Sequence, residues 1–154
     1  MRQSILLLSP RPGDKILELK TIFKVPALDD KQSAAILLVR LVMGIAFVTH
    51  GWSKIQDPMG WMGPDAAIPG FFLALAALSE FGGGIGLILG LLNPLVAAGL
   101  GSTMAVAVYS HVVLWGDSFD DYELALVYLV LVVLLAMLGP GKFSMDQKLF
   151  GTRK

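Results

Sequence analysis

Residues 71–115 read FFLALAALSEFGGGIGLILGLLNPLVAAGLGSTMAVAVYSHVVLW, and this stretch decides the fold. It is long enough to cross a bilayer twice, because a helix needs about 20 apolar residues to span the hydrocarbon core. Asn93-Pro94 interrupts it, so we expect one span at 71–92 and another at 95–115. Because the backbone in lipid must satisfy its own hydrogen bonds, both spans are predicted to be helices.

Two further apolar segments, 33–50 and 122–138, bring the expected spans to four. Hydrophobic residues make up 55% of the 154-residue chain and charged residues 16%, which is more apolar surface than a small soluble domain can bury. We therefore predict an all-α polytopic membrane protein, a four-transmembrane-helix bundle. The expected organisation is an N-terminal segment at 1–32, a transmembrane domain at 33–138 and a C-terminal tail at 139–154.

The basic residues predict the orientation. They gather before the first span and after the fourth, while the connection 51–70 holds only Lys54 and the connection 116–121 holds none. By the positive-inside tendency, both termini are cytoplasmic. Twelve basic and twelve acidic residues cancel, so nothing points to nucleic acid as a partner. Residues 13–26 have the spacing of an amphipathic helix on the inner leaflet, and a disordered tail is an equal alternative.

Glu80 is the polar residue that most needs an explanation, because it lies near the middle of the second span. An isolated carboxylate there either takes up a proton or finds a partner. Arg40 is the only basic residue deep in another span. We therefore predict a buried Arg40–Glu80 pair. Two alternatives stay open, namely Arg40 extending to the lipid headgroups and Glu80 held as a neutral carboxyl group.

Glycines flank Glu80 in two patterns. One is GxxxGxxxG, which permits close approach of another helix, either within the chain or from a second copy in a homo-oligomer, and it consists of Gly82, Gly86 and Gly90. The other is the pair Gly83 and Gly84, which we expect to leave space beside the Glu80 side chain.

A second polar group is expected near the outer face. His50 ends the first span and His111 lies near the end of the third, so the two could relay protons. Ligation of a b-type haem by His50 and His111 is the less favoured alternative, and we expect no metal site. The absence of cysteine excludes thiolate-held clusters and disulfides. The connection at 60–72 is expected to be either an interfacial cap or a plain loop, and three tryptophans fit an outer aromatic belt, Trp52, Trp61 and Trp115.

Three motifs together resemble the DoxX family of small four-span bacterial and archaeal membrane proteins. They are LLVRLVMGIAFVTHGWSKI at 37–55, LSEFGGGIGLILGL at 78–91 with NPL after it, and YELALVYLVLVVLLAMLGPGKFSMD at 122–146. The resemblance covers about residues 33–146 and implies a multi-pass protein of the inner membrane. It marks as family positions Arg40, His50, Gly51, Lys54, Glu80, Gly83, Glu123, Gly139, Pro140, Gly141, Ser144 and Asp146.

The resemblance also implies a link to quinones and to oxidative-stress defence. From it we expect a quinone- or quinol-linked accessory subunit that works with membrane or cytoplasmic redox partners, and not a complete enzyme on its own. Glu80 and Arg40 would form the proton or quinone site, and the remaining cofactor contacts would come from Gly83, Gly84, Lys54 and Glu123. A non-catalytic scaffold for redox proteins is the alternative, and a small-solute carrier is less favoured.

Overall fold

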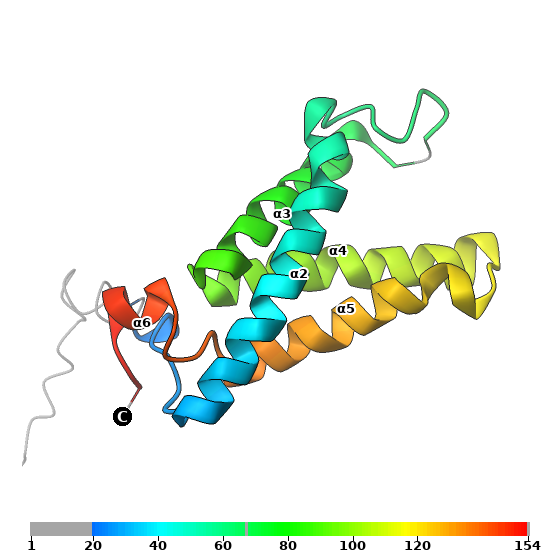
Figure 1. Ribbon diagram of the computed structural model, residues 1–154. Coiled ribbons are helices and arrows are strands. Elements are labelled where there is room, and N and C mark those ends of the chain that lie inside the picture. Colours follow the sequence, from blue (N-terminus) through cyan, green and yellow to red (C-terminus); the bar gives the residue numbers. More distant parts are fainter. Residues whose placement is uncertain (1–19, 67, 154) are drawn as a thin grey trace, which may run out of the picture.

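The computed structural model describes residues 20–66 and 68–153, and its regular structure is helical (Figure 1). The elements are α2 (Asp30–Gln56), α3 (Gly70–Leu89), α4 (Asn93–Tyr109), the π-helical η1 (Ser110–Trp115), α5 (Phe119–Leu138) and α6 (Met145–Phe150). Within the described residues, the only β feature is an isolated bridge between Val25 and Thr152. The prediction of an all-α fold is confirmed.

Four helical stretches are long and apolar enough to cross a membrane, as predicted: Asp30–Gln56, Gly70–Leu89, Asn93–Trp115 and Phe119–Leu138. The first extends beyond the expected range of 33–50 at both ends. It begins after a capping box, in which the Asp29 carboxylate accepts from the Gln32 amide and the Gln32 side chain accepts from the Asp29 amide. It also continues past His50 to Gln56, because Gly51 packs inside the helix pair and does not end the helix.

The helices form two hairpins, α2 with α3 and α4 with α5, joined by the short turn at residues 90–92. We call the end of the molecule that holds this turn the joined end. From there the hairpins diverge, so the connection between α2 and α3 and the connection between η1 and α5 lie well apart (Figure 1). These two connections are called the loop ends.

The core lies where the hairpins cross near the joined end. Its fully buried members come from different helices and include Met43, Phe47, Leu100 and Leu135. The Phe47 ring packs against Tyr128 with ring centroids 4.9 Å apart. Since most other apolar side chains of α5 remain exposed, they are suited to contact with lipid.

Both described ends of the chain meet at the joined end. The Val25 amide donates to the Gly151 carbonyl at 3.0 Å, the Arg153 amide donates to the Val25 carbonyl at 2.8 Å, and Phe23 packs on Phe150. Residues 139–150, expected to be a tail, fold back under the spans and include α6. Residues 20–22 are helical, and the first half of the predicted amphipathic helix, residues 13–19, lies outside the described residues.

Candidate functional site

The buried Glu80 carboxylate is paired with Lys54. The Lys54 ammonium nitrogen lies 2.6 Å from Oε1 and 2.7 Å from Oε2 of Glu80, whose side chain is 4% exposed. The helix register creates this pair. Gly51 lets α2 approach so closely that a Cβ atom built on it would lie 2.5 Å from the Phe81 amide nitrogen, and Lys54 follows one turn later on the same helix.

The predicted Arg40–Glu80 pair is therefore wrong. Both oxygens of Glu80 are bound by Lys54, and Arg40 binds backbone carbonyls elsewhere. The prediction assumed that the first span ends at His50, which would place Lys54 in a loop. Because α2 continues to Gln56, Lys54 extends beside α3 and reaches Glu80.

The connection at 57–69 covers this ion pair with Trp61. The Trp61 ring centroid lies 4.6 Å from the Lys54 ammonium nitrogen, and the indole Nε1 donates to the Leu73 carbonyl at 3.1 Å. A cation over an aromatic face is attracted to the ring electrons. The hydrogen bond to α3 holds the ring in that place, so Trp61 is part of the site although the sequence suggested only an interfacial anchor.

Next to Trp61, the same connection encloses an open hollow of about 520 Å³. Its lining comes from the connection and from the start of α3, and it includes Asp57, Met59, Pro64, Gly70 and Leu73. Leu73 also accepts the Trp61 hydrogen bond and so connects Trp61 to the hollow, although Lys54, Trp61 and Glu80 do not line it. The Lys54 side chain is 24% exposed, whereas the Glu80 side chain is 4% exposed.

Arg40 serves a different purpose at the joined end. Its guanidinium donates to the carbonyls of Leu87 and Ile88 at 2.9 and 3.1 Å, and to those of Pro140 and Phe143 at 2.7 and 3.0 Å. The last carbonyls of a helix lack intrahelical partners. Arg40 therefore satisfies the end of α3 and fastens the segment after α5 to it.

Asp146 binds the free backbone amides at the start of α4, as Arg40 binds the free carbonyls at the end of α3. Its two carboxylate oxygens accept from the amides of Leu92 and Asn93 at 2.7 and 2.8 Å, and its own amide donates to the Gly90 carbonyl. Asn93 in turn donates from Nδ2 to the Leu135 carbonyl, near the end of α5. We call Arg40, Asn93 and Asp146 the polar clamp. All three are buried, and together they tie the ends of α3, α4 and α5 to one another.

The glycines beside Glu80 do not leave space for a ligand. A Cβ atom on Gly83 would lie 3.0 Å from Leu100, and one on Gly84 would lie 2.7 Å from the Val48 amide nitrogen. The protein itself fills the space expected there. The GxxxGxxxG face is also divided, because Gly86 packs on Val96 and Gly90 on Arg40, whereas a Cβ atom on Gly82 would have room, 3.7 Å from Leu78. Gly86 and Gly90 are therefore covered by residues of the same chain, and contact with a second copy through this face stays a prediction.

The other predicted site residues are not brought to the Lys54–Glu80 pair. His50 is exposed on α2, while His111 lies in η1, at the loop end of the other hairpin (Figure 1). His111 Nδ1 lies 2.7 Å from an Asp117 oxygen, and its ring meets Trp115 edge to face. Glu123 is exposed near the start of α5. Across residues 20–66 and 68–153, no three side chains of metal-binding type gather to hold an ion.

Sequence reasoning missed two residues of these sites, Trp61 and Asn93. Tryptophan beside a span usually marks the membrane interface, so nothing in the sequence distinguished Trp61 from Trp52 or Trp115. Asn93 was interpreted only as part of a helix break. The available signal was the asparagine itself, because a buried amide needs hydrogen-bond partners.

Comparisons with known proteins agree with this architecture. The family model described as DoxX matches residues 35–113. The inner membrane protein YqjF of Escherichia coli K12 is 33% identical over 131 residues, which cover 77% of this chain and 94% of that protein. An uncharacterized protein of Haemophilus influenzae is 33% identical over 118 residues, covering 73% of this chain and 88% of that one. No solved structure matches significantly.

Proposed function

The chain belongs to the DoxX family of membrane proteins, and from this premise we propose that it is a quinone-linked accessory subunit of a redox system in the inner membrane. The proposal includes an orientation with the joined end in the cytoplasm, because most basic residues of the sequence precede the first span or follow the fourth, while the connections 51–70 and 116–121 hold only Lys54. The Lys54–Glu80 pair would be the proton-exchanging part of the site.

The observation that carries the proposal is the buried, doubly bonded Lys54–Glu80 pair under Trp61. Four hydrogen bonds from Arg40 to backbone carbonyls account for Arg40 structurally, whereas the pair caps no helix end. An ionisable pair inside a membrane span is costly and is by default a functional candidate. Its neighbour, the hollow of about 520 Å³, has room for a ring-sized headgroup.

The chemistry assigned to the pair is proton exchange with a bound quinol. Oxidation of a quinol to a quinone releases two electrons and two protons. The Glu80 carboxylate takes one proton when the Lys54 ammonium moves away from it, and the second proton passes to water at the loop end. The electrons pass to a haem or iron–sulfur protein that acts as partner, since a chain without cysteine offers no thiolate for a cluster. This division of labour is why the chain is proposed as an accessory subunit.

Mass spectrometry of a solvent extract from mildly purified protein tests the proposal. We expect quinone to be enriched over bulk lipid, and the enrichment to be lost in Glu80→Gln. The matched control is Asp65→Asn, which changes an exposed acid of the same connection that does not line the hollow. If Glu80→Gln does not fold, the double variant Lys54→Met with Glu80→Leu serves in its place. A quinone content equal to that of the membrane in the unmodified protein contradicts the proposal.

A scaffold for redox proteins is the second candidate, and the polar clamp favours it. The clamp fixes residues 139–146 under the spans, so the exposed Lys142 and Lys148 are held on a defined surface. A scaffold would still bind its redox partner proteins in Glu80→Gln, and it would lose this binding in Lys142→Gln with Lys148→Gln. The two variants therefore distinguish the two functions.

A further inference from the structure

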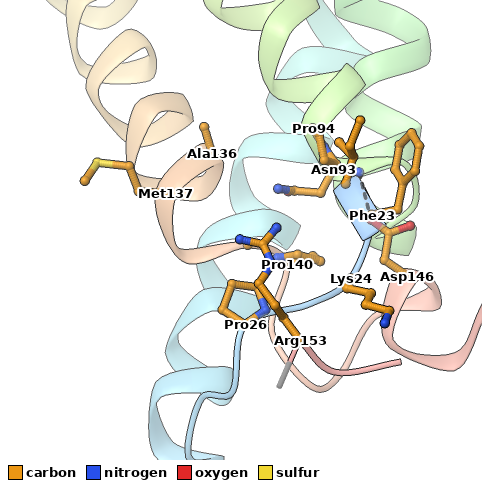
Figure 2. A pocket seen from close by; sticks show the side chains of 12 residues that line it. Phe23, Lys24, Pro26, Asn93, Pro94, Ala136, Met137, Pro140, Asp146 and Arg153 are labelled. Carbon is orange, nitrogen blue, oxygen red and sulfur yellow. Dashed lines mark hydrogen bonds between the residues drawn. The ribbon is translucent and has the colours of Figure 1, made fainter. Parts of the chain in front are cut away.

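A small hollow of about 40 Å³ lies at the joined end, between the start of α4 and the end of α5 (Figure 2). It has room for a few water-sized groups. The lining combines polar and apolar side chains. Lys24, Arg153 and Asn93 provide the polar groups, while Phe23, Pro94 and Met137 are among the apolar ones.

The hollow lies at the depth of the lipid headgroups. One membrane-spanning stretch begins at Asn93 and another ends at Leu138, and both residues border or adjoin the hollow. Because a span ends where the hydrocarbon core gives way to the polar layer, side chains here face phosphate groups and acyl chains at once. The outer rim fits this setting, since Ile22 is 53% exposed and Met137 is 75% exposed.

The hollow has an excess of positive charge, because its one acid is bound to backbone amides while its two basic side chains have no such partner within the described part of the chain. Asp146 is its one acid, and both of its oxygens accept amides at the start of α4, while Arg40 attracts the same carboxylate. Neither Lys24 nor Arg153 has a side-chain hydrogen bond or ion pair among the described residues. Figure 2 shows the Arg153 side chain extending toward Pro140 and Lys24 lying on the side of Asp146.

We propose that this hollow binds the phosphate headgroup of an anionic phospholipid. The planar guanidinium of Arg153 is suited to hold two phosphate oxygens at once, and Lys24 adds a second positive charge. The acyl chains would run along Met137 and Ile22, whose exposed side chains continue from the hollow. This proposal is independent of the quinone site, because the two sites share no residue.

Native mass spectrometry of the full chain tests it, with phosphatidylglycerol and phosphatidylcholine titrated separately into a neutral detergent. We expect the unmodified protein to retain phosphatidylglycerol preferentially. In Lys24→Gln with Arg153→Gln, affinity should fall about tenfold or more, because the phosphate loses its charge-assisted hydrogen bonds to both side chains. The backbone bonds of Val25 with Gly151 and Arg153 do not depend on either side chain, so folding should be retained.

The matched control is Lys31→Gln with Lys148→Gln, which removes the same charge from exposed residues that do not line the hollow. An equal loss of affinity in both double variants would show diffuse attraction and overturn the site. So would equal retention of the two lipids by the unmodified protein. A third arm titrates inorganic phosphate alone. If the protein retains inorganic phosphate as well as it retains phosphatidylglycerol, the hollow is a site for the free ion instead of a lipid.

Discussion

Arg40 and Asp146 bind opposite sides of the same turn. The Arg40 guanidinium accepts no hydrogen bond and donates to the carbonyls at the end of α3, while the Asp146 carboxylate accepts the amides of Leu92 and Asn93 at the start of α4. A helix carries partial negative charge at its C-terminus and partial positive charge at its N-terminus. A cation at the first end and an anion at the second are therefore both favourable, and the two residues also attract each other.

Arg40→Met should destabilise the protein strongly. The change keeps most of the apolar volume but leaves the carbonyls of Leu87, Ile88, Pro140 and Phe143 without their donor. Loss of one partner of a buried charged network costs about 3–5 kcal/mol. Denaturation in mixed detergent micelles, followed by circular dichroism, measures this loss.

Lys142→Met is the control for that variant, because it breaks the exposed pair with Asp30 and leaves the clamp intact. An exposed pair of this kind contributes about 0–1 kcal/mol. Similar small losses in the Arg40 and Lys142 variants would show that the hydrogen bonds of Arg40 contribute little.

Asp146→Ala should loosen the start of α4 in particular. The amides of Leu92 and Asn93 lose their acceptors. A buried donor left without its charged hydrogen-bond partner costs about 2–3 kcal/mol. Hydrogen exchange read by mass spectrometry should be faster in peptides covering residues 90–97. The exchange rate of Asp146→Asn should lie between those of the unmodified protein and Asp146→Ala, because the one carbonyl oxygen of asparagine can accept only part of these hydrogen bonds.

The exposed Asp120, in the first turn of α5, provides the comparison for Asp146. Asp120→Ala removes a favourable interaction with the helix dipole that is worth less than about 1 kcal/mol. Faster exchange spread evenly over all four spans in Asp146→Ala would show that this residue does not act at the start of α4.

The apolar runs and their breaks were sufficient to predict the four spans, because in lipid the hydrogen-bonding needs of the backbone leave few alternatives to a helix. The ends of the spans were harder to predict. Gly51 resembles a helix stop after His50, yet it lies inside α2. Glycine is needed there because a Cβ atom would collide with the backbone of Phe81 on α3. Because of that error of a few residues, Lys54 was expected among the cofactor contacts but not as the partner of Glu80.

The partners of the buried charges could not be derived from depth along each span. Arg40 and Glu80 are on neighbouring helices, but the carbonyls freed at the end of α3 are nearer acceptors for Arg40. Every residue has a backbone carbonyl, so the residue types in the sequence do not indicate that these carbonyls bind Arg40. Likewise, Asp146 is separated by more than 50 residues from the amides it binds, and only the fold brings them together.

The Lys54–Glu80 pair should behave as one unit in a double-mutant cycle. Lys54→Met and Glu80→Leu should each cost about 3–5 kcal/mol, since each leaves one charge in the span without its partner. The double variant should be more stable than either single variant, because no unpaired charge remains. Denaturation in micelles gives the three free-energy changes. If the effects simply add, the ion pair contributes no coupling energy and the charges are solvated independently.

Gly84→Ala should be destabilising, whereas Gly82→Ala on the same helix should not. A Cβ atom on Gly84 would lie 2.7 Å from the Val48 amide nitrogen and 2.9 Å from the Gly44 carbonyl oxygen, so α2 and α3 would have to separate. Overpacking of this kind costs about 1–3 kcal/mol. A Cβ atom on Gly82 meets only Leu78, at 3.7 Å, so alanine there should be neutral or stabilise the helix by up to about 1 kcal/mol. Denaturation in micelles and light scattering after size exclusion check both variants. A loss in Gly82→Ala as large as that in Gly84→Ala, together with a smaller particle, would place Gly82 against a second copy of the chain.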